Sequence, residues 1–193
     1  MKRVILFLCA AIVFAGCSKD LWDCNGRTSK SAMEVMASAE YWQEVRTHHY
    51  TEPNGGGDEY ISYTEGMDVI GSGLRRVGME DGKLIKYYSY AIPPEKPYYV
   101  EFIIEDLGNG MYSIKRESRD YYWRILSYDE DDLKIETDAY SIIHGKDENG
   151  EWKRYPYARV HFKRQTAPYP NWKDFYISYE EMLQQKEDEK NNQ

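Results

Sequence analysis

The sequence predicts a mainly β protein: an antiparallel up-and-down meander that closes into a barrel or a curved sheet, with a short N-terminal helix and a short C-terminal helical segment. Three observations lead to this prediction. Runs rich in Tyr, Ile, Val and Phe, which favour strands, follow one another between turn residues. Several runs alternate apolar and polar residues, as half-buried antiparallel strands do. No helical pattern interrupts residues 59 to 165, which excludes parallel βαβ units.

The chain begins with the features of a secretory leader. Lys2 and Arg3 are followed by an apolar run, Val4–Phe14, that is too short to span a bilayer stably. Two small residues then precede Cys17, and this arrangement resembles the lipobox of bacterial lipoproteins. The resemblance implies that residues 1–16 are removed and that Cys17 is lipidated as the new N-terminus. An ordinary cleaved signal is the alternative.

A tether and a helix are expected next. Residues 17–30 are polar and aperiodic, which is typical of a linker between a lipid and a folded domain. Ser31 and Glu34 have the spacing of a capping box, so a helix is predicted to begin there and to fade by Arg46. Its apolar stripe recurs at helical intervals and consists of Ala32, Val35, Met36, Ala39 and Trp42.

The predicted β region follows a glycine-rich loop. Strand-like runs lie near 59–64, 68–79, 83–91, 98–105, 111–117, 121–128, 133–144 and 152–165. Asp81-Gly82 and Asn109-Gly110 are typical of tight hairpin turns, because these residues adopt positive φ angles readily. Alternation is clear in the run that holds Val100, Phe102 and Ile104 and in the run that holds Ala158, Val160 and Phe162. The sequence therefore predicts one domain over residues 31–170.

Residues 171–193 are predicted to form a C-terminal helical tail. Ser178 and Glu181 have capping-box spacing. Apolar side chains follow on one side of the expected helix, from residues Phe175, Tyr179, Met182 and Leu183.

This layout resembles the lipocalin-like lipoproteins of Bacteroidetes. The matching features are Gly16-Cys17, the pair Tyr41-Trp42 ahead of the sheet, and Trp123-Arg124-Ile125-Leu126 followed by an acidic turn and Leu133-Lys134-Ile135. The Gly-x-Trp found in many lipocalins is absent, since Glu40 and Tyr41 precede Trp42. The resemblance implies a lipid-anchored small antiparallel barrel.

Charge and cysteine content exclude several classes of function. The formal net charge of −8 becomes −10 when the leader takes away its two positive charges, so nucleic acid is not expected as a partner. Cys9 leaves with the leader and Cys17 is consumed by lipid. Cys24 then remains alone, which excludes an intramolecular disulfide in the mature chain.

The sequence predicts no catalytic residue, no metal site and no cofactor. His48 and His49 are adjacent, so on a strand they point to opposite faces and cannot share an ion. His161 falls on the polar face of its strand. The acidic run Asp129–Asp132 lacks the glycine and distal glutamate of a calcium loop and is interpreted as a solvated hairpin turn. No nucleophile elbow, phosphate-binding loop or dinucleotide fingerprint occurs.

We therefore expect a non-enzymatic lipoprotein of the cell envelope, on the outer membrane, that binds a small apolar or glycan ligand or another envelope protein. The expected lining of the ligand site is aromatic and apolar: Tyr88, Tyr90, Val100, Phe102, Trp123 and Phe162. The same side chains could instead fill the barrel solid. A surface hydrolase, a polysaccharide-processing accessory protein and a purely structural envelope protein are the alternatives, and exposure at the cell surface is left open.

Overall fold

A computed structural model describes residues 21–24, 26–64, 74–89, 97–116, 119–147, 149–166 and 171–191. The predicted leader, Cys17 and Tyr90 lie outside these residues. The elements, in chain order, are α2 (Ala32–Ser38), β1 (Tyr41–Glu52), the 3-10 turn η1 (Pro53–Gly55), β2 (Gly56–Thr64), β3 (Leu74–Glu80), β4 (Lys83–Ser89), β5 (Tyr98–Gly108), β6 (Met111–Arg116), β7 (Arg119–Tyr128), β8 (Asp132–Lys146), β9 (Trp152–Gln165), the 3-10 turn η2 (Trp172–Phe175), β10 (Ile177–Ser178) and α3 (Tyr179–Asn191).

The strands form a closed antiparallel barrel. From β3 to β9 each strand pairs antiparallel with the next one along the chain, and β9 pairs with β1 to close the sheet. Both β2 and β3 pair with β1. Strand β2 lies opposite Arg46–Glu52, and β3 lies opposite Trp42 and Gln43, so β2 and β3 occupy one strand position of the barrel. The barrel therefore has eight strand positions in sequence order. The predicted up-and-down meander that closes on itself is confirmed.

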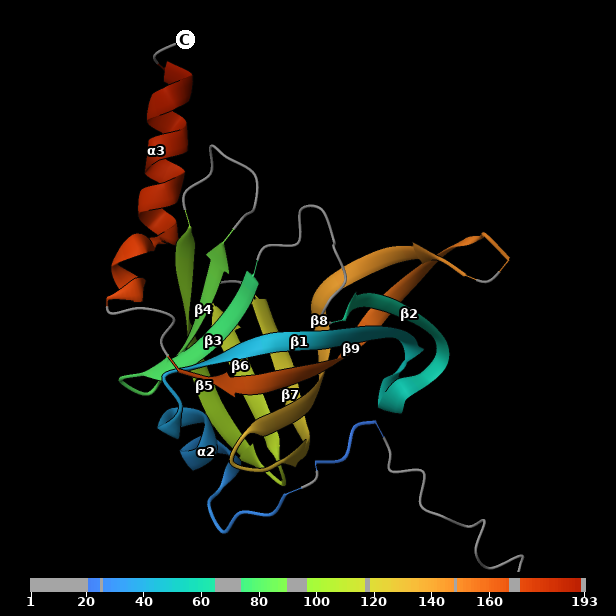
Figure 1. Ribbon diagram of the computed structural model, residues 1–193. Helices are drawn as coiled ribbons and strands as arrows, with labels where there is room; N and C mark the ends of the chain where they lie inside the picture. The colour runs from blue at the N-terminus through green and yellow to red at the C-terminus, as the bar shows by residue number, and fades with distance from the viewer. Residues whose placement is uncertain are drawn as a thin grey trace, which may run out of the picture.

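The turns between strands use the residues that were expected. Asp81 and Gly82 have φ values of 48° and 76°, and Asn109 and Gly110 have φ values of 53° and 73°. Two consecutive positive φ angles match the right-handed twist of the flanking strands, which is why Asp-Gly and Asn-Gly are favoured here. The β3–β4, β5–β6 and β7–β8 turns lie at the end of the barrel covered by α2, and α3 projects from the opposite side (Figure 1).

The N-terminal helix is shorter than predicted. The capping box is present, with the Glu34 N–H donating to Ser31 Oγ at 3.3 Å and the Ser31 N–H donating to Glu34 Oε2 at 2.7 Å. The helix ends at Ser38, however, and Trp42 lies on a strand. Tertiary pairing overrides local helical spacing here, because β9 needs β1 as its partner to close the barrel.

The C-terminal tail packs against the outside of the barrel. Trp172 and Tyr176 form a second apolar cluster with Tyr41, Ile85 and Tyr87 on the outer face of the sheet. Strand β10 pairs in parallel with β5, and the predicted second capping box begins α3, where the Glu181 N–H donates to Ser178 Oγ at 3.1 Å. None of the helices among the described residues has both the length and the apolar character needed to cross a bilayer.

Candidate functional site

The interior of the barrel holds one continuous core. Strand register places side chains of β8 and β9 opposite one another on the inner face, in the pairs Leu133–Phe162, Ile135–Val160 and Thr137–Ala158. All six side chains are buried. Val35 and Met36 of α2 belong to the same apolar cluster, so the helix closes one end of the barrel with buried side chains.

The predicted ligand-lining residues lie in this core. Val100, Phe102, Trp123 and Phe162 are all buried in the main cluster, and Tyr88 packs against it while remaining partly exposed. The ring centroids of Trp123 and Phe162 lie 5.9 Å apart. Tyr90, the sixth predicted residue, falls outside the described residues. The five described residues therefore lie in or against the core inside the barrel, and four of them are buried parts of that core. Their contact with a ligand stays a prediction.

Lys86 also points into the barrel, a position that the sequence pattern does not predict. On β4 the residues Leu84, Lys86 and Tyr88 are in step and pair with inward-facing residues of β5. Lys86 is 2% exposed. Its Nζ donates to Tyr121 Oη at 3.1 Å and lies 4.8 Å, 4.6 Å and 5.4 Å from the ring centroids of Phe102, Tyr121 and Trp123. An ammonium group therefore sits among the faces of three aromatic rings.

Aromatic rings continue from Lys86 toward the side that carries α3. The rings of Tyr88 and Tyr98 are stacked with centroids 5.2 Å apart, and Tyr179 of α3 lies 5.7 Å from Tyr98. Burial raises the pKa of Tyr121, so its hydroxyl stays protonated and can donate or accept a hydrogen bond. Apolar side chains fill the α2 end of the barrel, whereas the Lys86 region combines rings, hydroxyl groups and a positive charge.

Trp123 adds a further polar atom to this region. Its side chain is fully buried, and its Nε1 makes no hydrogen bond to any residue that the structure describes. A buried indole N–H without an acceptor costs free energy, because it has lost its hydrogen bond to water.

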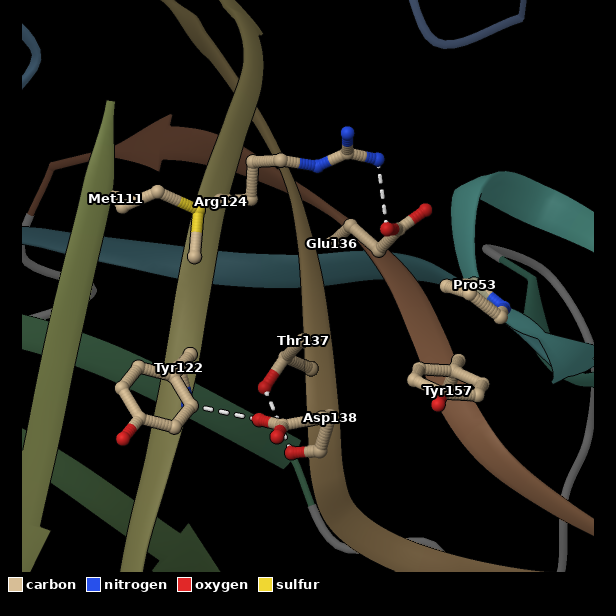
Figure 2. A pocket seen from close by; sticks show the side chains of 8 residues that line it. All are labelled: Pro53, Met111, Tyr122, Arg124, Glu136, Thr137, Asp138 and Tyr157. Carbon is tan, nitrogen blue, oxygen red and sulfur yellow. Dashed lines mark hydrogen bonds and ion pairs between the residues drawn. The ribbon is translucent and has the colours of Figure 1, made fainter. Parts of the chain in front are cut away.

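A hollow of about 190 Å³ lies on the outer wall of the barrel, and Figure 2 shows its lining. The Glu136 carboxylate in this hollow accepts several hydrogen bonds. It accepts a hydrogen bond from Arg124 at 2.7 Å, from Arg159 at 3.0 Å and from the Asn54 N–H at 3.2 Å. The Tyr122 N–H donates to Asp138 Oδ1 at 2.8 Å beside it. These bonds join β7, β8, β9 and η1, so we interpret the network as structural.

A second hollow, of about 500 Å³, lies between α2 and the β6–β7 hairpin. Its lining is mainly apolar and includes Ala32, Tyr112 and Ile125. It presents no charged side chain among its lining residues, so it offers less chemistry for recognition than the Lys86 region does.

The histidines and the acidic turn make structural contacts. His48 Nδ1 lies 2.7 Å from Glu59 Oε1, and His161 contacts Asp132. Asp129 is buried rather than solvated: its carboxylate accepts from the N–H groups of Asp131 at 2.9 Å, Asp132 at 2.8 Å and Gly26 at 2.8 Å. Over the described ranges, no group of three or more His, Cys, Asp and Glu side chains could hold a metal ion.

No protein-family model matches this chain, and none of the curated proteins matches it either. Three structures of bovine odorant-binding protein are similar to this chain over most of its length. The complex with undecanal is 14% identical, with 85% of this chain and 88% of that chain covered and a TM-score of 0.38. The complex with the natural ligand has the same identity and coverage and a TM-score of 0.37. The deswapped triple mutant is 15% identical, with 78% and 85% covered and a TM-score of 0.35.

The strand order is lipocalin-like. Among the described residues, eight strand positions follow one another in sequence order, with the short helix α2 before them and α3 after them. The similarity to odorant-binding protein is distant.

Proposed function

We propose that this chain is a non-enzymatic protein of the cell envelope, anchored on the outer membrane through a lipid on Cys17, whose barrel binds a small ligand with an apolar body and an acidic group. The observation that carries the ligand proposal is the position of Lys86. An ammonium group inside a barrel of aromatic side chains suits a carboxylate, which forms a charge-assisted hydrogen bond with it.

The surrounding residues support the same ligand class. Tyr121 offers a neutral hydroxyl at 3.1 Å from the ammonium, and Trp123 offers a buried indole N–H. The rings of Tyr88 and Tyr98 provide apolar surface beside them. Because Trp42, Trp123 and Phe162 fill the core, the proposed ligand is small and lies near Lys86, on the side where Tyr98 contacts Tyr179 of α3.

Two sequence features support the envelope location. The arrangement of small residues before Cys17 is the feature that implies lipidation, and the apolar run before it is the feature that implies export. Anchoring is tested by mass spectrometry of the protein purified from membranes. A mature chain that begins at Cys17 and carries acyl chains supports the proposal, whereas an unmodified chain in the soluble fraction contradicts it.

Ligand binding is tested with a matched pair of probes, dodecanoate and dodecanol, titrated against the purified protein by calorimetry. We expect dodecanoate to bind more tightly than dodecanol, and Lys86→Met to weaken dodecanoate binding by about 10- to 100-fold while dodecanol binding changes little. Lys83→Met is the control, because Lys83 lies on the same strand but is exposed and paired with Glu101. Equal affinities for the two probes, or no binding of either, would contradict the proposal.

A further inference from the structure

The segment between the predicted lipid site and α2 is attached to the barrel. We call residues 21–24 and 26–30 the N-terminal strap. Trp22 is its most buried residue. The Trp22 ring meets His48 edge-on with centroids 5.3 Å apart, and the Arg159 guanidinium lies 5.9 Å from the Trp22 ring. Both partners belong to the outer face of the barrel, on β1 and β9, so the strap lies across that wall.

Backbone carbonyl groups of the strap are bound by side chains of the wall. Lys134 Nζ donates to the carbonyl oxygens of Leu21 at 3.1 Å and Asp23 at 2.6 Å. Ser127 Oγ donates to the carbonyl oxygen of Trp22 between them. Lys134 is buried, so these carbonyl groups replace water as the partners of its ammonium. The strap carbonyl groups thus stabilise the buried charge of Lys134, so the strap is bound to the barrel and is not a free linker.

A second set of contacts holds the strap at the β7–β8 turn. The Gly26 N–H donates to Asp129 Oδ2 at 2.8 Å, and Thr28 Oγ1 donates to Glu130 Oε1 at 2.7 Å. Lys30 Nζ forms an ion pair with the other oxygen of Glu130 at 3.0 Å. The approach at Gly26 is close, because a Cβ there would lie 2.7 Å from Asp129 Oδ2. The strap is therefore held at two places, at Leu21–Asp23 and at Gly26–Lys30.

This attachment limits how far the barrel can lie from a lipid on Cys17. Leu21 follows Cys17 by four residues, and four fully extended residues span at most about 14 Å. Leu21 is 45% exposed. Ile61 pairs with His48 in the sheet and is 46% exposed on the same wall. An anchored chain would thus keep Leu21, and the wall to which it is attached, within a short distance of the headgroups.

We call the outer face of β8, β9, β1 and the neighbouring β2 the strap wall. We propose that the barrel rests on the bilayer with the strap wall toward the lipid and the β5 wall away from it. This inference rests on the lipidation of Cys17 proposed above. In the eight-position ring, β5 lies four positions from β9, and α3 and β10 pack on the β5 side. Lys86 lies on β4, the neighbour of β5, so in this orientation it faces away from the lipid.

Two exposed isoleucines on opposite walls provide a matched test. Ile61 lies beside the strap, and Ile103 lies on β5 and is 64% exposed. Ile61→Cys and Ile103→Cys are each made in a Cys24→Ser background, purified from membranes, labelled with a fluorophore and reconstituted into phosphatidylcholine vesicles whose headgroups carry a nitroxide quencher. We expect the label on Ile61→Cys to lose most of its fluorescence and the label on Ile103→Cys to keep it.

A third variant separates the strap from the anchor. Adding Lys134→Met and Ser127→Ala removes the side chains that bind the strap carbonyl groups. Quenching of the label on Ile61→Cys should then fall to the level seen for Ile103→Cys, while the protein still floats with the vesicles. Equal quenching of the two single labels in floating protein overturns the orientation alone. Protein that does not float with vesicles overturns the proposed anchor, and the orientation with it.

Discussion

The Trp42 indole N–H donates to the Met36 carbonyl oxygen at 3.1 Å, and this bond joins the last turn of α2 to the start of strand β1. Carbonyl groups at the end of a helix have no partner within the helix. The fully buried Trp42 ring supplies one, so a single side chain both ends α2 and fills the core. The short helix and the closing strand therefore depend on each other.

Trp42→Phe should destabilise the protein by about 1 to 3 kcal/mol, because the ring remains but the Met36 carbonyl group loses its donor in a buried place. The free energy of unfolding is measured by urea denaturation. Trp152→Phe is the control. Because Trp152 is 70% exposed, this substitution should change the free energy of unfolding by less than about 0.5 kcal/mol. Equal effects of the two substitutions would show that the indole N–H of Trp42 has no special role.

Glu136→Gln should cost about 2 to 4 kcal/mol, because it leaves the positive charges of Arg124 and Arg159 without their shared carboxylate at a buried position. Glu105→Gln breaks the exposed ion pair with Lys115 and should cost less than about 0.5 kcal/mol. Both values come from chemical denaturation at neutral pH. If the two substitutions cost the same, the Glu136 network is not what holds η1 and the three strands together.

The elements with strong local signals were predicted well. Both capping boxes form at the predicted serines, Ser31 and Ser178, and the Asp-Gly and Asn-Gly turns have the expected positive φ angles. These features depend on residues close in sequence. Strand β1 was mistaken for the end of the helix, because Val35, Ala39 and Trp42 keep a helical spacing and the demand for a partner strand comes from β9, more than a hundred residues later.

The interior positions of Val100, Phe102 and Phe162 could be predicted from the alternation of their strands, whereas their contact with a ligand stays a prediction. Lys86 was missed because β4 is buried on both faces: Ile85 and Tyr87 are covered by the C-terminal tail, so the strand shows no alternation that marks the inner face. The signal that could have found Lys86 is its register with Leu84, two residues earlier on a strand.

Acidification should weaken the attachment of the strap through Asp129. Burial alone would raise the pKa of this carboxyl. The hydrogen bonds from the N–H groups of Asp131, Gly26 and Asp132 lower the pKa by more than burial raises it, so the pKa lies below its ordinary value. A group whose pKa is lowered by folding stabilises the native state above its unfolded pKa, and this stabilisation is lost as the pH falls through the folded pKa. The expected window therefore lies at and below about pH 4.

Asp129→Asn tests this assignment. The variant should be less stable than the native sequence at neutral pH, and the difference should shrink as the pH falls below about 4, where the native carboxyl becomes neutral as well. Thermal unfolding monitored across a pH series gives both curves. A difference that stays constant at every pH would mean that Asp129 does not titrate on unfolding.

Lys86→Met should leave the stability of the ligand-free protein unchanged or raise it by about 1 kcal/mol, because an apolar side chain of similar length avoids the cost of removing an ammonium group from water. Together with weaker binding of dodecanoate, this outcome would show that Lys86 serves recognition at the expense of stability. Leu84→Ala is the contrast, since it removes a fully buried apolar side chain on the same face and should cost about 2 to 5 kcal/mol. A large loss of stability in Lys86→Met would identify Lys86 as a structural residue instead.

Trp172→Ala should destabilise the whole protein by about 3 to 5 kcal/mol, because Trp172 joins the C-terminal segment to the outer face of the barrel. Its ring centroid lies 4.9 Å from both Tyr41 and Tyr87, and Arg76 packs on it at 5.6 Å. Phe175→Ala is the matched control three residues later, since Phe175 is largely exposed and should change stability by less than about 0.5 kcal/mol. Urea denaturation followed by tyrosine and tryptophan fluorescence distinguishes the two possible roles of the segment. One cooperative transition shifted to lower urea in Trp172→Ala shows that the tail is part of the barrel fold, whereas an unshifted transition would show that it is an appended segment.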